Sequence, residues 1–501
     1  GNSRTSEVQW RPGGWRHRVR VGVRAVLGNG WRRAQRNRIC GESVRWNRCV
    51  RGAWQCDEHL YWCGNDQGGH IEAWNVRCLE CGWWSGRWFF KIDMDISSHN
   101  EGLVGRHKRQ LEFLTSEVNV PSSLVQKLKD FQIAIPSWAL GTGGTRFGRF
   151  SAGGEPRNLE EKIADVGLLH SLNKSSGAIS LHIPWDIPSD PKAIMNLAAQ
   201  HGLAFDAVNS NTFQDQAGQA LSYKFGSLQH VSKATRKQAI DHNIEVIKQG
   251  VSLGSKSLTV WLSDGSCFPG QLNFRKTYQR TVDSLEEIYA ALPSDWKLYL
   301  EYKAYEPNFY STTVGDWGAS YSMVNKLGPK AYTLVDLGHH LPNANIEQIV
   351  SILLMEGKLG GFHFNDSKYG DDDLTAGSIK PYQLFLIFNE LVEGMDARGM
   401  NHAKDLGWMI DASHNVKDPL EDLLQSVEAI QIAYAQALLV DQKALEIARD
   451  ENDVVQCQEI LQAAFRTDVR SIVAQARLEL GGALDPLAYF RHSKARAKLI
   501  E

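Results

Sequence analysis

The chain has 501 residues, 43% of them hydrophobic and 22% charged, and a formal net charge of −2 at pH 7. Such a length allows a large apolar core and two or three domains. We expect neither nucleic acid nor a membrane as a partner, because the charge favours no particular partner and no run reaches the roughly 18 apolar residues of a membrane span. The start of the chain has no secretory pattern, so the expected location is the cytoplasm.

Residues 1–93 differ in composition from the rest. They hold 10 of the 16 tryptophans, six of the eight cysteines, and 15 arginines against one lysine and eight acidic residues, and the first methionine is Met94. We interpret them as upstream sequence read through in the gene model or as a disordered extension. One alternative is a zinc module, although Cys78-Leu-Glu-Cys81 is the one short ligand spacing. The other is a basic arm that binds nucleic acid, for which no recognisable module is present.

Strand and helix patterns alternate from residue 131 onward, after a polar helical segment over 94–130. Eight short apolar runs rich in β-branched or aromatic residues are typical of strands buried on both faces. Alternation with short links predicts a parallel sheet, and eight units in about 290 residues predict a closed (β/α)8 barrel over 131–418. The predicted strands are 131–138, 179–185, 205–211, 257–265, 298–303, 333–340, 360–366 and 406–414.

The stretch GTGGTRFGRFSAGG at 141–154 follows the first predicted strand. It matches neither the P-loop pattern nor the dinucleotide fingerprint G-x-G-x-x-G. We interpret it as a flexible cover over the barrel mouth, with Phe147 and Phe150 suited to a hydrophobic lid; a phosphate cradle is the alternative. Residues 419–501 are predicted to be helices without chemistry that pack on the barrel or on a neighbouring subunit.

Side chains that ligate metals stand at the ends of the last four predicted strands. Carboxylates at strand ends often cap the next helix, and a single barrel histidine is usually a core residue. Four consecutive strands, however, should bring their ends together on one side of the mouth, where such barrels form active sites. Without a cation, this cluster would cost several kcal/mol in desolvation and repulsion. We therefore predict a metalloenzyme with a divalent cation held by Glu301, Asp336, His363 and Asp411.

A second group lies close by in sequence. His339 is three residues past Asp336, and Asp371 and Asp373 flank Asp372 in the loop after the seventh strand. Alternate residues of an extended loop point the same way, so Asp371 and Asp373 can both face inward. With Asp336 as a bridge they could hold a second ion. Oxygen-rich ligation with histidine favours manganese, cobalt or magnesium over structural zinc.

From about residue 131 the chain resembles the L-rhamnose isomerases, in particular their broad-specificity bacterial branch, which is related to the xylose isomerases. The matching motifs are IPSWALGTGGTRFGRF, LHIPWD, VNSNTFQDQ, TVWLSDG, EYKAYEPNFYSTT, LVDLGHHLPN, GGFHFNDSKYGDDDLTAGSIKPYQLF and WMIDASHNVKDP. The resemblance implies an aldose–ketose isomerase that interconverts L-rhamnose and L-rhamnulose and also acts on other aldoses, with two Mn²⁺ ions per subunit (Co²⁺ or Mg²⁺ as alternatives). It also implies a homo-oligomer, specifically a homotetramer.

The same resemblance implies roles for single residues. The first group above would hold the structural metal. His339, Asp371 and Asp373, with Asp336 shared, would hold the catalytic metal, and the catalytic residues would be Lys303, Asp373 and His339. The sugar would be contacted by His182, Trp185, Trp261, Lys303 and Phe147, the last of these donated by a neighbouring subunit.

Several alternatives stay open at this point. Hydrogen transfer between C1 and C2 could follow a metal-assisted 1,2-hydride shift, which we favour, or a cis-enediol route with a carboxylate base. Lys303 could act as an electrophile at O1 or as an ion-pair partner of the carboxylates. A ketose 3-epimerase or another sugar epimerase is the nearest rival function, but Glu301 is the single glutamate at a strand end. An endonuclease and an inactive scaffold fit the residues less well.

Overall fold

The computed structural model describes residues 95–141, 150–151, 153–306, 309–412 and 416–495, and the backbone of three short strands nearer the N-terminus. The chain divides into two units, Gly1–Trp88 and Phe89–Glu501. In the first, β1 (Cys49–Val50), β2 (Ala53–Cys56) and β3 (His59–Trp62) form an antiparallel sheet that the sequence pattern did not predict. The interpretations of 1–93 as read-through, zinc module or basic arm otherwise lie outside the described residues.

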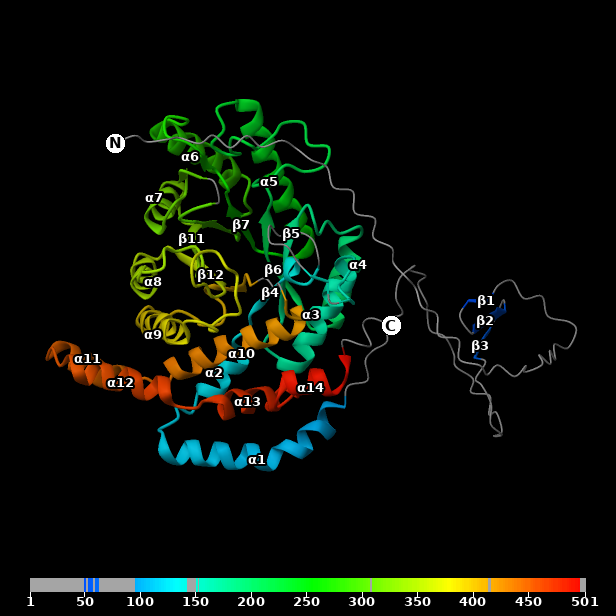
Figure 1. Ribbon diagram of the computed structural model, residues 1–501, viewed down its shortest axis with the longest axis vertical. Coiled ribbons are helices and arrows are strands. Elements are labelled where there is room, and N and C mark those ends of the chain that lie inside the picture. Colours follow the sequence, from blue (N-terminus) through cyan, green and yellow to red (C-terminus); the bar gives the residue numbers. More distant parts are fainter. Residues whose placement is uncertain are drawn as a thin grey trace, which may run out of the picture. The chain divides into compact units, whose positions relative to one another are not determined.

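The second unit contains a closed barrel of eight strands (Figure 1), as predicted. Every neighbouring pair is parallel and the strands follow chain order around the barrel. Each predicted strand corresponds to one barrel strand, and every observed strand except β6 is shorter than predicted. They are β4 (Ala134–Pro136), β5 (Ala178–Ile183), β6 (Ala204–Ser210), β7 (Ser257–Trp261), β9 (Lys297–Glu301), β11 (Ala331–Asp336), β12 (Leu359–Phe364) and β13 (Gly407–Ile410).

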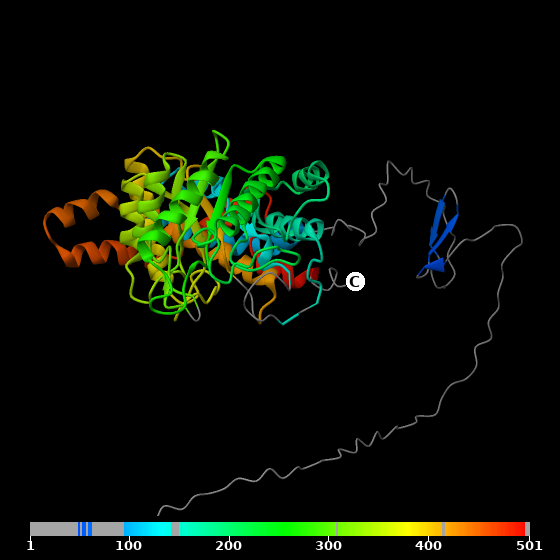
Figure 2. The same ribbon diagram turned by 90° about the horizontal axis from the view of Figure 1, so that it is seen from above.

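Helices surround the barrel and cover the outer faces of the strands (Figures 1 and 2). Most begin at an Asn, Asp or Ser whose side chain accepts a hydrogen bond from the first turn, and this caps amides that have no partner inside the helix. The helices are α3 (Leu159–Asn173), α4 (Pro191–Gln200), α5 (Lys233–Leu253), α6 (Phe274–Ala290), α7 (Trp317–Leu327), α8 (Ile346–Met355), α9 (Pro381–Ala397) and α10 (Pro419–Ala437).

The core has two layers separated by the strands. Between strands and helices, aromatic rings stack: Phe362 lies 5.7 Å from Trp408, and Phe364 lies 5.6 Å from Phe388. Inside the barrel a separate cluster is formed by Ala134, Ala207, Tyr299, Leu334 and Met409. This interior packing makes the barrel a solid support, so the ends of the strands are held rigidly at its mouth.

Further helices precede and follow the barrel. α1 and α13 are joined by a 2.8 Å hydrogen bond between His107 Nε2 and Gln475 Oε1, whereas α11 and α12 form a hairpin that projects away from the barrel (Figures 1 and 2). Among the described residues no single helix is long and apolar enough to cross a membrane, although α10 and α11 together pass that test across a 62° bend. The bounds are α1 (Ile96–Glu117), α2 (Leu124–Asp130), α11 (Gln442–Asp450), α12 (Val454–Arg466), α13 (Arg470–Glu479) and α14 (Pro486–His492).

Candidate active site

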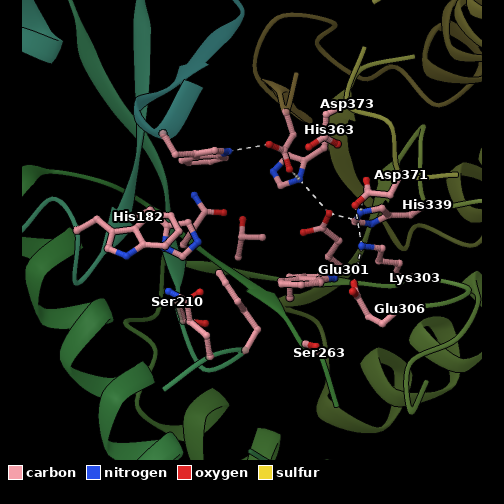
Figure 3. A pocket seen from close by; sticks show the side chains of 18 residues that line it. His182, Ser210, Ser263, Glu301, Lys303, Glu306, His339, His363, Asp371 and Asp373 are labelled. Carbon is pink, nitrogen blue, oxygen red and sulfur yellow. Dashed lines mark hydrogen bonds and ion pairs between the residues drawn. The ribbon is translucent and has the colours of Figure 1, made fainter. Parts of the chain in front are cut away.

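A cavity of about 220 Å³ lies at the carboxyl ends of the strands (Figure 3). Its lining divides along the chain into two sets of different chemistry. The neutral half carries aromatic and uncharged polar groups and consists of Trp138, His182, Trp185, Asn209, Ser210, Phe213, Gln214, Thr259, Trp261 and Ser263. The ionic half carries the acidic and basic groups and consists of Glu301, Lys303, Glu306, His339, His363, Asp371, Asp373 and Asp411.

Strand register brings the first predicted ligand group together. β9 ends at Glu301, Asp336 ends β11 directly opposite His363 of β12, and the amide of Asp411 donates to the carbonyl of Phe364 at 3.1 Å. One ligand atom from each of Glu301, Asp336, His363 and Asp411 lies within 4.8 Å of those of the other three. The convergence expected from four consecutive strand ends is therefore present.

A second, overlapping group consists of Asp336, His339 and Asp371, whose ligand atoms also lie within 4.8 Å of one another. Asp336 belongs to both groups, as a bridging residue should. His339 Nε2 is 3.2 Å from an oxygen of Asp371, and His339 Nδ1 lies 3.0 Å from the carbonyl of Tyr302. That backbone contact directs Nε2 toward Asp371 and Asp336, while Nδ1 also lies 3.2 Å from Glu301 Oε1.

Asp373 lines the cavity but is not a member of this second group. The loop is not extended as predicted, although Asp371 and Asp373 both line the cavity, as expected. The amide of Asp372 donates to the carbonyl of Gly370 at 2.8 Å, and Asp373 has a left-handed backbone with φ 48°. The loop is a turn, held by hydrogen bonds from two backbone amides to the carboxylate of Asp372. The role of Asp373 as a ligand or catalytic residue stays a prediction.

The hydrogen bonds of the first group leave polar atoms that suit a cation. Asp336 Oδ1 accepts from Gly338 N at 2.8 Å and from Asn365 Nδ2 at 2.9 Å, whereas its Oδ2 is buried without a hydrogen-bond partner. His363 Nδ1 is the ring nitrogen that faces the group: it donates to Glu301 Oε1 at 3.0 Å and lies 3.8 Å from Asp336 Oδ2 and from Asp411 Oδ2. Its other nitrogen, Nε2, is buried without a hydrogen-bond partner. Unsatisfied buried atoms are costly. A donor set of carboxylate oxygens and imidazole nitrogens fits a divalent cation.

The charges of this cluster shift its pKa values strongly. Burial alone would lower the pKa of His363, but the neighbouring carboxylates, Glu301 first, raise it to about 9. For Glu301, burial acts upward, yet His363 and His339 lower its pKa below the usual range. Burial raises the pKa of Asp336. His363 therefore carries a proton that partly neutralises the carboxylates, a role that a divalent cation would take over.

Lys303 is buried between two carboxylates. Its Nζ lies 2.7 Å from Asp371 and 2.5 Å from Glu306, and 5.1 Å from the centre of the Trp261 ring. The ion-pair role considered for this lysine is thus present in the structure, and its role as an electrophile stays a prediction. Sequence reasoning missed Glu306, which stands three residues after Lys303 in the EYKAYEP motif.

In the neutral half, His182 is surrounded by aromatic rings. Its ring centre lies 4.2 Å from that of Trp185, 5.4 Å from that of Trp138 and 5.5 Å from that of Phe213. Burial lowers the pKa of His182 to about 3, so the imidazole is neutral. This half offers an apolar wall with a neutral hydrogen-bonding group.

Of the predicted sugar contacts, His182, Trp185, Trp261 and Lys303 all line the cavity, whereas Phe147 lies outside the described residues. Sequence reasoning overlooked Trp138 and Phe213. Both stand just past strand ends, in IPSW and VNSNTF, and this position was the signal that could have found them.

No protein-family model matches the chain. It is 56% identical over 375 residues to a probable sugar isomerase of Mesorhizobium japonicum, covering 74% of this chain and 86% of that protein. A probable sugar isomerase of Rhizobium meliloti is 55% identical over 408 residues, covering 81% of this chain and 94% of the relative. The chain belongs to this family of probable sugar isomerases.

Solved structures similar to this chain include L-ribulose 3-epimerase, with a TM-score of 0.44 and 15% identity over 65% of this chain and 98% of that one. Another is D-psicose 3-epimerase from Clostridium cellulolyticum, with a TM-score of 0.40 and 12% identity over 62% of this chain and 99% of that one. The sequence predicted a metalloenzyme. Membership in a family of probable sugar isomerases and the buried groups that could hold metal ions agree with that prediction.

Proposed function

We propose that the chain interconverts L-rhamnose and L-rhamnulose, accepts other aldoses, and uses two divalent cations per subunit, with Mn²⁺ preferred. The observation that carries the proposal is the pair of ligand groups that share Asp336, because two adjacent cations suit the two adjacent sugar oxygens of this reaction. Family membership supports sugar isomerisation, and the L-rhamnose assignment follows from the motifs quoted above.

The ionic half suits the chemistry at C1 and C2. Aldose–ketose conversion moves one hydrogen between these carbons and exchanges a carbonyl with a hydroxyl. Bound cations would supply Lewis acidity at the two oxygens. Glu301, Asp336, His363 and Asp411 would hold one cation, and Asp336, His339 and Asp371 the other. The ammonium of Lys303 would donate a hydrogen bond to O1 and stabilise negative charge there. This geometry is compatible with the favoured hydride shift.

The neutral half suits the rest of the sugar. Trp185, Trp261 and Phe213 provide apolar surface for the methyl group of a 6-deoxy sugar, and neutral His182 can hydrogen-bond a hydroxyl. Hydrophobic discrimination of one methyl or hydroxyl is roughly 10–200-fold, which supports activity on several aldoses. The proposal extends to a cytoplasmic homotetramer in which Phe147 of a neighbouring subunit covers the sugar.

The test is ketose formation from L-rhamnose by the full chain after metal removal, with and without added Mn²⁺. We expect turnover that depends on Mn²⁺ and is lost in Asp336→Asn. The exposed Asp241→Asn serves as a matched carboxylate control. A folded, Mn²⁺-loaded enzyme that forms no ketose from L-rhamnose, but exchanges configuration at C3 of a free ketose, would replace the proposal with an epimerase.

A further inference from the structure

Trp138 joins the two halves of the cavity. It lies in the 3-10 turn η1 (Ser137–Ala139) directly after β4, and its indole Nε1 donates a 2.7 Å hydrogen bond to Oδ1 of Asp411, just after β13. β13 and β4 are neighbours where the barrel closes. The indole is buried, with 7% of Trp138 exposed. A donor from the neutral half thus reaches a carboxylate of the first ligand group.

The orientation of the Asp411 carboxylate depends mainly on this one hydrogen bond, unlike that of the other three side chains in the first ligand group. Its side chain is 22% exposed, against 0–3% for Glu301, Asp336 and His363. Among the described residues, its carboxylate accepts one hydrogen bond, the one from Trp138, and His363 Nδ1 is 3.8 Å from its other oxygen. The indole donor therefore sets which oxygen of Asp411 faces the ligand group.

The turn that carries Trp138 is itself held by a buried carboxylate. Asp186 accepts from Ser137 Oγ at 2.5 Å, from Lys162 Nζ at 2.6 Å and from the backbone amide of His182 at 2.9 Å. Only 2% of Asp186 is exposed. These bonds tie the ends of β4 and β5 to helix α3, so the indole of Trp138 has a fixed direction.

We propose that Trp138 is a positioning residue: its indole orients the carboxylate of Asp411 for a divalent cation. Asp186 in turn positions the turn that carries Trp138. The inference rests on the metal assignment of the proposed function but not on the identity of the sugar. Groups that orient a metal ligand typically contribute 10–100-fold to metal affinity.

The experiment measures Mn²⁺ binding to metal-stripped full-length protein by the electron paramagnetic resonance signal of free Mn²⁺, without sugar. Trp138→Phe keeps the ring and removes the donor. Trp185→Phe is the matched control, because Trp185 lines the same cavity in the neutral half. We expect one Mn²⁺ site to weaken about 10–100-fold in Trp138→Phe and to stay within about twofold of wild type in Trp185→Phe.

A double-mutant cycle with Asp411→Asn tests the route of the effect. If Trp138 acts through Asp411, Trp138→Phe weakens Mn²⁺ binding no further in the Asp411→Asn background, whereas an equal loss in both backgrounds would overturn the proposal. Asp186→Asn is the second variant should Trp138→Phe not fold, and we expect a smaller loss in the same direction. The proposal would also be overturned if folded Trp138→Phe bound Mn²⁺ with unchanged affinity. If Trp138→Phe does not fold, unchanged affinity in Asp186→Asn would overturn the proposal instead. Absence of Mn²⁺ binding to wild type would instead reject the proposed function.

Discussion

Two histidines on opposite sides of the same cavity show what distinguishes its halves. His182 and His363 are both buried, and burial acts on both by disfavouring the imidazolium ion. Aromatic rings surround His182, whose pKa is lowered to about 3. His363 is 3.0 Å from Glu301 and near two further carboxylates, and its pKa is raised to about 9. Neighbouring charge, not depth, therefore decides the chemistry of each half.

This difference has a simple origin in the topology. Strands follow chain order around the barrel, so cavity residues up to Ser263 share one side and those from Glu301 onward share the other. A barrel built in this way can separate an apolar binding surface from a polar reaction centre by placing them in different halves of the sequence. Changes in one half should then affect binding or catalysis selectively.

The largest effect is expected when the ionic half loses its shared ligand. Asp336→Asn should lower kcat/KM by at least about 10³-fold and abolish binding of both cations, because this carboxylate belongs to both groups. Enzyme kinetics together with metal stoichiometry after dialysis checks this. Retention of one tightly bound cation would show that Asp336 does not bridge.

Replacing Lys303, whose ammonium group is buried in the ionic half, should separate catalysis from metal binding. Lys303→Met should lower kcat about 10²–10³-fold, as loss of a preorganised donor does. Mn²⁺ affinity should stay equal or become tighter, since a positive charge 2.7 Å from Asp371 opposes a bound cation. Weaker Mn²⁺ binding in this variant would assign Lys303 a purely structural role.

The two histidines predict a pH dependence of metal binding. A cation binds neutral imidazole, so at pH values below about 9 His363 must release its proton on binding. Apparent Mn²⁺ affinity should therefore rise about tenfold per pH unit between roughly pH 7 and 8.5. His363→Gln should remove this slope, whereas His182→Gln should keep it, because His182 does not titrate in that range. Calorimetry in buffers of different ionisation enthalpy measures the released proton.

The smallest effect is expected in the neutral half. Phe213 lies 4.6 Å from the ring of Trp261 and lines the cavity. L-mannose differs from L-rhamnose by a hydroxyl group in place of one hydrogen of the C6 methyl group. Phe213→Leu should reduce the preference for L-rhamnose over L-mannose by about three- to tenfold. Mn²⁺ affinity should not change. A fall in kcat with unaltered sugar preference would place Phe213 in the reaction rather than in recognition.

Much of the fold followed from local patterns. Short apolar runs that alternate with amphipathic stretches indicated eight parallel strands, and all eight are present. The strand ends were placed less well: the prediction 333–340 included His339, but β11 ends at Asp336 and the chain then turns. The residues after Asp336 are Leu-Gly-His-His, and composition alone does not show where the last ladder hydrogen bond falls.

By itself, the sequence determined which strand ends carry ligand groups, and hence that Glu301, Asp336, His363 and Asp411 converge, because a parallel barrel places all its carboxyl ends on one face. Tertiary structure alone decided how loop residues turn: Asp373 falls outside the second ligand group, and Glu306 reaches Lys303. It alone brought Trp138 to Asp411 across 273 residues. Such contacts depend on barrel closure and side-chain direction, which local periodicity does not encode.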